Sequence, residues 1–193
     1  MEAIEAIITR RSTRKYADKI LEKELIEKVI NAGRHAPSGG NSQTTHFIVF
    51  TDKKQLKEMS DIVQGEFAKM EVTEGMYASL KASITASKKG GYVFHYNAPV
   101  FIAIANKKGY GNAIADSSCA LENMMIAANA LDLGSCWINQ LHWLDENERV
   151  HKFMMSNGLE TDETITGGLI LGYSDGELNR EPLERKGNPV TWA

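Results

Sequence analysis

The chain of 193 residues alternates between stretches whose apolar positions have helical spacing and short, continuously apolar runs. Near the N-terminus, Ile4, Ile7 and Ile8 recur at helical spacing until a run of arginines interrupts the pattern. Residues 22–36 repeat the pattern, and Pro37 ends it because proline cannot continue the hydrogen bonding of a helix. The first forty residues therefore predict two amphipathic helices.

The rest of the chain continues with the same two signals. Apolar runs predict buried strands at 46–50, 99–105 and 166–173. Helices are predicted within the lysine-rich stretch 53–90, over the nearly all-apolar 116–133, and over the amphipathic 145–156. No repeat or shift in composition marks a second domain. We therefore expect a single domain, residues 1–193, with helices on both faces of a small sheet.

The tail, residues 174–193, has no periodicity that predicts a helix or a strand. It nevertheless contains Leu183, Val190 and Trp192, whereas disordered tails are usually poor in large apolar side chains. We therefore expect an extended arm that docks on a surface, and a partner subunit is one candidate for that surface.

Composition restricts the classes of function. A formal net charge of -3 argues against a nucleic-acid-binding protein that relies on a broad basic surface. Cys119 and Cys136 are too few for a disulfide framework, and the five histidines share no ligand spacing, so no metal is expected. No apolar run reaches membrane-spanning length, and the N-terminal stretch is too charged for a signal peptide. These features favour a cytoplasmic protein without a membrane partner.

A basic cluster follows the first predicted helix. Arg10, Arg11, Ser12 and Arg14 place three guanidinium groups and a hydroxyl within five residues, and such a set of donors suits a phosphate. A structural alternative is that cations near a helix C-terminus complement the helix dipole. The cluster alone leaves both interpretations open. Two further segments with related chemistry favour the anion site.

The first of these segments, residues 36–43, lies between a predicted helix and a predicted strand. Its Pro, Gly, Ser and Asn residues are also what an ordinary connecting loop would use. However, the amides of Asn41 and Gln43 offer donors and acceptors that match a pyrimidine edge or the ribityl hydroxyls of a flavin. The second segment, residues 184–188, adds Arg185 and Lys186.

The three segments together resemble the FMN-binding signature of the nitroreductase family. The run 10–14, followed by 36–43 and His46-Phe47, looks like the opening of such a protein, and 167–173 with the basic tail looks like its short-chain branch. The resemblance spans essentially the whole chain. It implies a nitroreductase-like α+β fold with a central, mostly antiparallel sheet covered by helices. It also implies a homodimer that binds FMN at the subunit interface.

The resemblance implies roles for individual residues. The residues that correspond to holders of the flavin phosphate and ribityl chain are Arg10, Arg11, Ser12, Arg185 and Lys186. Those that correspond to a segment from the other subunit are Pro37, Ser38, Gly39 and Asn41, with Gln43 beside them. The loop that passes the isoalloxazine ring near N5 corresponds to 134–140, including Trp137, Ile138, Asn139 and Gln140. Arg14 corresponds to a basic residue near N1 and O2, where it would tune the redox potential. An Asn and Lys pair at the pyrimidine edge of longer members has no clear counterpart between residues 60 and 90.

The activity implied by the resemblance is hydride transfer from NADH or NADPH to FMN. Two electrons then pass to a small nitroaromatic, quinone or enone acceptor by a ping-pong mechanism. Because the flavin does the chemistry, no catalytic side chain is assigned. Two alternatives stay open: a non-catalytic flavin- or nucleotide-binding protein, and a reductive dehalogenase-type member of the same fold.

Two smaller features have more than one interpretation. Tyr92, Phe94 and Tyr96 alternate before a predicted strand, and they either line an aromatic acceptor site or form part of the core. Cys136 is either a reactive thiol near the flavin or a small buried hydrophobe, and the second is the commoner role for such a cysteine.

Overall fold

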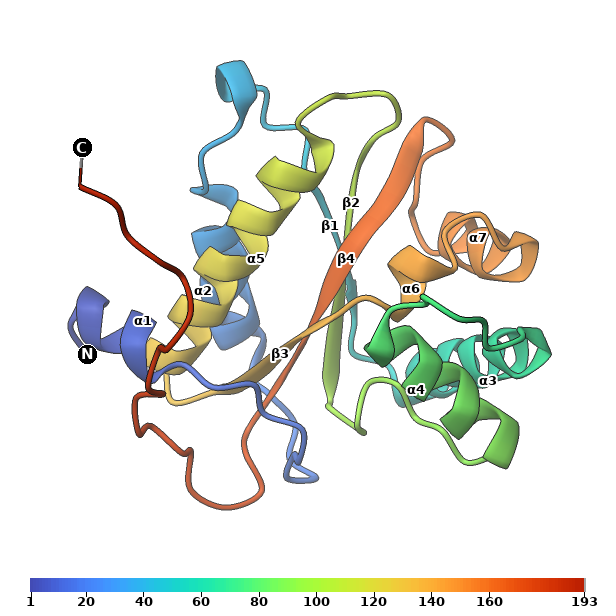
Figure 1. Cartoon of the computed structure of the whole chain (residues 1–193), viewed down its shortest axis with the longest axis horizontal. Coiled ribbons are helices and arrows are strands. Elements are labelled where there is room, and N and C mark those ends of the chain that lie inside the picture. Colours follow the sequence, from blue (N-terminus) through green and yellow to red (C-terminus); the bar gives the residue numbers. More distant parts are fainter. Residues whose placement is uncertain (193) are drawn as a thin grey trace.

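A four-stranded antiparallel sheet lies at the centre of the computed structural model, which describes residues 1–192 (Figure 1). Its strands are β1 (His46–Phe50), β2 (Val100–Lys107), β3 (Gly134–Ile138) and β4 (Glu163–Gly172). The spatial order is β1-β2-β4-β3, and each neighbouring pair is antiparallel. The expected α+β class with an antiparallel sheet is therefore confirmed.

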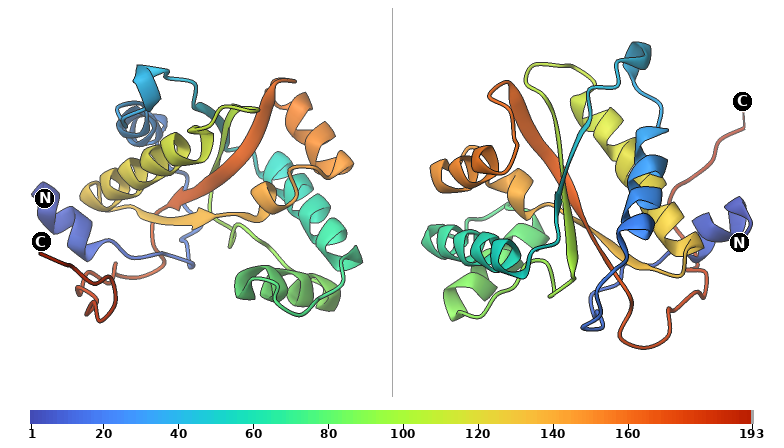
Figure 2. Two further views of the ribbon diagram at one scale, coloured as in Figure 1. Left: turned by 45° about the horizontal axis from the view of Figure 1, so that its top comes forward. Right: turned by 180° about the vertical axis from the view of Figure 1, so that it is seen from behind.

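Helices cover both faces of the sheet, as expected (Figure 2). One layer contains α2 (Lys23–Arg34) and α5 (Ala113–Ala130), and α1 (Ala3–Thr9) packs against α5. The other layer contains α3 (Lys53–Lys69), α4 (Ala78–Lys89), α6 (Gln140–Trp143) and α7 (Glu148–Ser156). A short 3-10 turn, η1 (Gly39–Asn41), lies in the loop between α2 and β1. No helix among residues 1–192 combines the length and the hydrophobicity that a bilayer-spanning segment needs.

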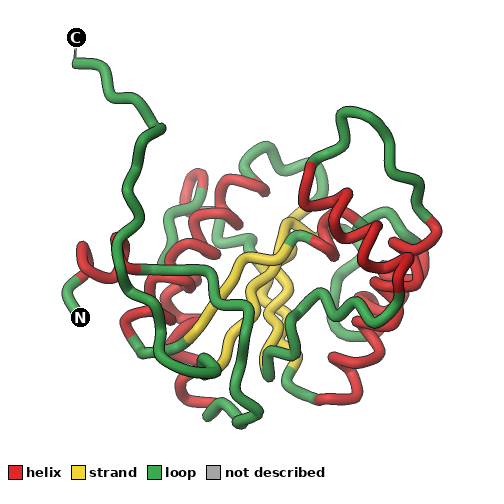
Figure 3. Tube along the Cα trace, turned by 60° about the horizontal axis from the view of Figure 1, so that its bottom comes forward, coloured by secondary structure: helices red, strands yellow, loops and turns green. Residues whose placement is uncertain are grey.

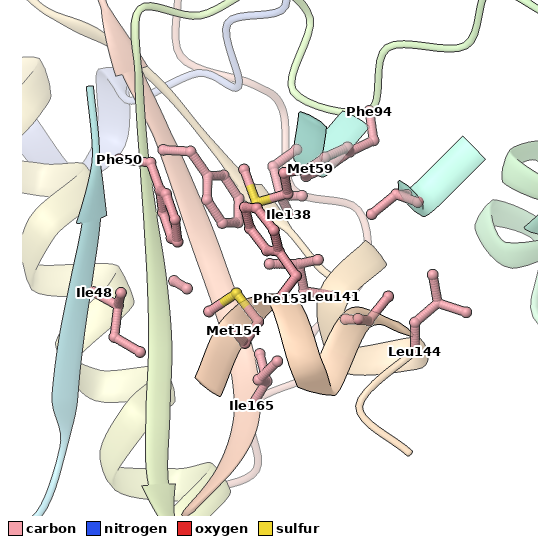
Figure 4. Close-up of a cluster of buried hydrophobic side chains, with 14 of the residues drawn as sticks. Ile48, Phe50, Met59, Phe94, Ile138, Leu141, Leu144, Phe153, Met154 and Ile165 are labelled. Atoms are coloured by element: carbon pink, nitrogen blue, oxygen red, sulfur yellow. The ribbon is translucent and has the colours of Figure 1, made fainter. Parts of the chain in front are cut away.

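The central strand β2 explains why the sheet has two hydrophobic cores. Phe101 and Ala103 point to the layer of α3 and α7, whereas Ile102 and Ile104 point to the layer of α2 and α5, because side chains alternate along a strand. All four side chains are fully buried. Figure 4 shows the first of these cores, to which β1, α3 and α7 contribute labelled residues such as Phe50, Met59 and Phe153.

Helix boundaries differ from the predicted ones by a few residues for local reasons. Asp52 caps α3, because its carboxylate accepts hydrogen bonds from the backbone amides of Lys54 and Gln55. Asn147 caps α7 in the same way, so this helix begins at Glu148 rather than near residue 145. The long helix α5 begins at Ala113, three residues before its predicted start.

The prediction that residues 134–140 form a loop was wrong. Residues 134–138 form the edge strand β3, which pairs with β4 from Gly134 opposite Gly172 to Ile138 opposite Gly168. A five-residue segment that begins with Gly-Ser has little strand signal of its own. Its conformation depends on a partner strand about thirty residues away in the sequence.

Residues 174–192 of the tail form no helix or strand and extend away from the sheet (Figure 3). Its first half is held by Arg180, which forms an ion pair with Asp132 and donates a hydrogen bond to the backbone oxygen of Asn129. Further on, Val190 and Trp192 are 74% and 93% exposed, so they do not dock on their own chain.

Candidate functional site

The segment that carries the arginine cluster lies along the outer edge of β3. Ser12 forms a parallel bridge with Ser135, and the backbone amide of Thr13 donates a 2.8 Å hydrogen bond to the backbone oxygen of Ser135. Since β4 occupies the inner edge of β3, this short contact covers part of an edge that would otherwise be unpaired. The structure thus brings residues 10–14 and 134–140 together, although they are far apart in the sequence.

Gly134 permits this close approach. A Cβ atom at position 134 would lie 2.7 Å from Cγ2 of Thr13 and 2.9 Å from its Cβ, which is closer than side-chain carbons normally pack. The absence of a side chain at this position therefore allows the basic segment to follow the strand.

The three guanidinium groups of the segment have different surroundings. The buried Nε of Arg10 lies 3.4 Å from a carboxylate oxygen of Glu122 on α5. Arg11 donates a 3.0 Å hydrogen bond to the backbone oxygen of Glu181 in the tail. Helix α1 ends at Thr9, so the arginines follow the helix in extended chain and do not serve as charges in its last turn.

Arg14 lies at the other end of the segment, near Cys136. Burial raises the pKa of the Cys136 thiol, and the nearby charges of Arg14 and Arg10 oppose that rise. The thiol is 3% exposed, which agrees with a small buried hydrophobe rather than a reactive group. Cys119, by contrast, is exposed on α5.

The end of β3 is fixed by side-chain hydrogen bonds. Nε1 of Trp137 donates a 2.6 Å hydrogen bond to Oδ1 of Asn139, and Nε2 of Gln140 donates a 2.9 Å hydrogen bond to the hydroxyl of Tyr92. The side chain of Ile138 is buried in the hydrophobic core. For Ile138, the backbone is therefore the part that a ligand at this edge could contact.

The loop 37–43 lies at the opposite end of α5 from the basic segment (Figure 2). The backbone amide of Gly39 contacts Asp116 in the first turn of α5, whereas Asn129 near the other end donates a 2.9 Å hydrogen bond to Oγ1 of Thr9. Asp116 and Asn129 are thirteen residues apart, which corresponds to about 20 Å along the helix. The backbones of the two segments therefore lie far apart, although the Arg10 side chain reaches Glu122, six residues or about 9 Å along the helix from Asp116.

A buried carboxylate holds the loop in place. The amide of Gly39 lies 3.2 Å from both oxygens of Asp116, and the hydroxyl of Tyr110 lies 2.9 Å from Oδ2 of Asp116. The same hydroxyl is 3.1 Å from Oγ of Ser42. Asn41 is exposed and has a positive φ of 56°, a conformation that Asn tolerates better than most residues. The loop is thus fixed by contacts to its own chain while the Asn41 side chain remains free to bind a ligand.

Replacing Asp116 by alanine is expected to release the loop. The variant loses charge-assisted hydrogen bonds of the kind that contribute about 1.5–3 kcal/mol, so amide exchange at Gly39 should become at least tenfold faster. Hydrogen–deuterium exchange measures the effect. Asp116→Asn keeps an acceptor for the Gly39 amide and should be close to wild type. Ser118→Ala, elsewhere on α5, is the control, and equal exchange in both alanine variants would rule out the anchoring role.

A sequence profile for the nitroreductase family matches residues 7–173. The chain belongs to the nitroreductase family. The match begins just before the basic segment and ends immediately after β4, so the tail lies outside the matched residues. The expected family is confirmed, and the protein is an oxidoreductase of that family.

Several relatives in this family match the chain over nearly its whole length. A proposed NADH dehydrogenase/NAD(P)H nitroreductase from Archaeoglobus fulgidus is 30% identical over 188 residues, which cover 97% of this chain and 94% of the relative. A crystal structure of a nitroreductase with bound FMN from Bacteroides fragilis is 30% identical, covers 100% of both chains and has a TM-score of 0.87. A 4-nitrobenzoate reductase from Nocardioides sp. is 24% identical over 225 residues, which cover 96% of this chain and 89% of that protein.

The remaining predicted site residues are less organised within one chain. Arg185 and Lys186 are exposed, and Lys186 forms an ion pair with its neighbour Glu184. Among residues 1–192, no hydrogen bond or ion pair joins either of them to Arg10 or Ser12. Over the same residues, no group of three or more His, Cys, Asp and Glu side chains is arranged to hold a metal ion.

Tyr92, Phe94 and Tyr96, which precede β2, were expected either to line an acceptor site or to form part of the core. Phe94 is fully buried and packs edge-on against Phe101, at 5.4 Å between ring centroids, so it belongs to the core. Tyr92 is partly buried and faces a cavity. Tyr96 is also partly buried, and it lies close to Tyr16. All three contact the first hydrophobic core, with Phe94 inside it and the two tyrosines packed against it.

Proposed function

We propose that the protein transfers a hydride from NADH or NADPH to FMN and then passes two electrons to a nitroaromatic, quinone or enone acceptor. The proposal rests on one observation above all: the extended run 10–14 lies along the edge of β3 and reaches the 134–140 stretch. The FMN bound to the Bacteroides fragilis relative supports the choice of cofactor. A ping-pong mechanism follows if donor and acceptor use one site in turn.

The basic segment has the chemistry that an FMN phosphate requires. Arg10, Arg11 and Ser12 place two guanidinium groups and a hydroxyl within three residues. Guanidinium groups and hydroxyls form strong, charge-assisted hydrogen bonds to phosphate oxygens. FMN, when bound, supplies the hydride and electron-transfer chemistry, whereas the protein supplies binding, orientation and charge.

In this proposal, Arg14 favours the reduced cofactor by placing a positive charge where reduction creates a negative one. The reduced flavin carries this charge at N1, and the oxidised flavin does not. A guanidinium near N1 therefore stabilises one redox state selectively, which is what catalysis needs. Arg10, Arg11 and Ser12 hold the phosphate in both states.

Arg14→Met should lower the two-electron midpoint potential of the bound FMN by tens of millivolts. About 30 mV corresponds to 1.4 kcal/mol for a two-electron couple. Affinity for oxidised FMN should change much less. Lys15→Met, the neighbouring and exposed residue, is the matched control. An unchanged potential together with a large loss of oxidised FMN would assign Arg14 to phosphate binding instead.

We also propose a homodimer, in which loop 37–43 of one subunit completes the FMN site of the other. Its support is that no hydrogen bond or ion pair within residues 1–192 joins loop 37–43 to residues 10–14 of the same chain. Helix α1 leaves Ile4, Ile7 and Ile8 between 47% and 70% exposed, and the tail leaves Trp192 exposed as well. Exposed apolar side chains of this size are typical of a protein–protein contact where they lie together, as the three isoleucines do on one short helix.

Light scattering of the FMN-loaded protein at micromolar concentration is expected to give twice the chain mass of 21.4 kDa. The reason is that the exposed isoleucines and the tail would be buried between subunits. Truncation after residue 181 should shift the equilibrium toward monomer, since it removes Leu183, Val190 and Trp192. A wild-type mass of 21.4 kDa would contradict the shared site.

An absorption spectrum before and after anaerobic addition of NADH and NADPH tests the proposed activity. The purified protein should be yellow, and at least one of the two donors should bleach it. Colour without bleaching would favour the non-catalytic flavin-binding protein. A colourless protein that does not take up FMN would exclude both functions.

A further inference from the structure

A cavity of 580 Å³ opens between α3 and two loops. Residues 16–18 form one side, residues 91–99 form a second, and the first three turns of α3 form the third. A cavity of this size falls within the range that holds small organic ligands. Much of its wall is apolar and includes the rings of Tyr16 and Tyr92 together with Leu56.

Two residues of the cavity wall each carry a buried polar atom that has no hydrogen-bond partner within residues 1–192. These atoms are Oγ of Ser60 and Nδ1 of His95, and each residue is only 5% exposed. Buried polar atoms in folded proteins nearly always form a hydrogen bond, to the protein, to water or to a ligand. The Ser60 hydroxyl can donate to a ligand oxygen. The imidazole can do the same in the tautomer that carries a proton on Nδ1.

The cavity wall is close to electrically neutral. Lys53 lies 2.9 Å from Asp18, and Lys57 lies 2.6 Å from Asp61, so each cation at the rim already has a carboxylate partner. Burial lowers the pKa of His95, which leaves its imidazole uncharged at neutral pH. A charged ligand would lose hydration in this cavity without gaining an unpaired opposite charge.

The cavity adjoins both segments of the proposed flavin site. The hydroxyl of Tyr16 donates a 2.8 Å hydrogen bond to the backbone oxygen of Thr13, within the basic segment. The hydroxyl of Tyr92 accepts its hydrogen bond from Gln140, at the end of β3. Two residues of the cavity wall are therefore held by the two segments that would flank the ring of FMN.

We propose that this cavity is the acceptor pocket and that it selects uncharged aromatic acceptors, with Ser60 and His95 forming hydrogen bonds to a nitro or quinone oxygen. This inference rests on the proposed function. A nitro group gains two electrons, supplied by NAD(P)H through the cofactor, and two protons, and becomes a nitroso group and water. Residues 60 and 95 bind and orient the oxygen.

The experiment uses the FMN-loaded, oxidised protein and two matched probes, nitrobenzene and 4-nitrobenzoate. The oxidised protein has no electrons to transfer, so calorimetry measures equilibrium binding. We expect nitrobenzene to bind at least tenfold more tightly than the anion, since only the anion brings an uncompensated charge. Ser60→Leu fills the cavity and should weaken nitrobenzene binding at least tenfold, while FMN affinity stays unchanged.

Ser79→Leu, an exposed position on α4, is the control for the added side chain. If Ser60→Leu does not fold, Ser60→Ala removes only the hydroxyl and should weaken nitrobenzene binding about threefold or more. Three results would overturn the proposal: equal binding of both probes, unchanged nitrobenzene binding in the Ser60 variants, or weaker FMN binding with unchanged nitrobenzene binding. The last would show that the cavity holds an edge of the cofactor. Failure of the proposed function is a separate result, because it leaves the wild-type protein unbleached by NAD(P)H.

Discussion

Arg10→Glu is expected to yield a folded protein that no longer retains FMN. The change removes a charge-assisted phosphate contact of about 1.5–3 kcal/mol and introduces repulsion, so affinity should fall roughly 100-fold or more. The purified variant should be colourless. Fluorescence titration with FMN gives the affinity, and thermal unfolding without FMN reports on the fold.

Glu122 provides the matched control for this variant. Glu122→Gln removes the carboxylate charge of the 3.4 Å ion pair and leaves the Arg10 guanidinium in place. The Glu122→Gln variant should therefore lose the Arg10–Glu122 ion pair, as Arg10→Glu does, and still bind FMN. If Arg10→Glu stays yellow with unchanged affinity, Arg10 only anchors the segment to α5 and the phosphate lies elsewhere.

Gly134→Val should also abolish FMN binding, although position 134 need not touch the cofactor. The new side chain would collide with Thr13 and push the basic segment away from β3. Overpacking of this kind typically costs about 1–3 kcal/mol, which should lower the melting temperature without unfolding the two cores.

Two further variants separate displacement of the segment from general destabilisation. A double variant, Gly134→Val with Thr13→Gly, lacks the Thr13 side chain with which the valine would collide. It should therefore recover FMN binding. Gly168→Ala places a Cβ 2.6 Å from Cζ of Phe101 in the core, so it should destabilise the protein yet leave it yellow. If Gly134→Val binds FMN as tightly as the wild type, the position of the segment along β3 does not matter for the cofactor.

The sequence allowed the helices and the long strands to be predicted because their signals are local. Helical spacing marks α2, and a continuous apolar run marks β2, which is buried on both faces. The same reasoning failed for β3, which is short and begins with Gly-Ser. This strand is defined by its pairing with β4 and by the contact of Thr13 along its other edge.

The candidate site was predictable in its residue types but not in its geometry. The run of arginines was visible in the sequence, yet the separate partners of Arg10 and Arg11 come from α5 and the tail. No local sequence signal predicts the contact between Gly39 and Asp116, because Asp116 is 77 residues further along the chain. The presence of Ser60 and His95 in the wall of one cavity is likewise a product of the fold.

The placement of the basic segment and loop 37–43 at opposite ends of α5 makes subunit complementation possible. In the proposed dimer, each site takes its arginines from one chain and its loop from the other. A chain with a defective segment and a chain with a defective loop are each inactive as homodimers. When both are combined in one heterodimer, both lesions fall in the same site and the second site contains only wild-type residues. Co-expression of two colourless variants would therefore restore one FMN per dimer.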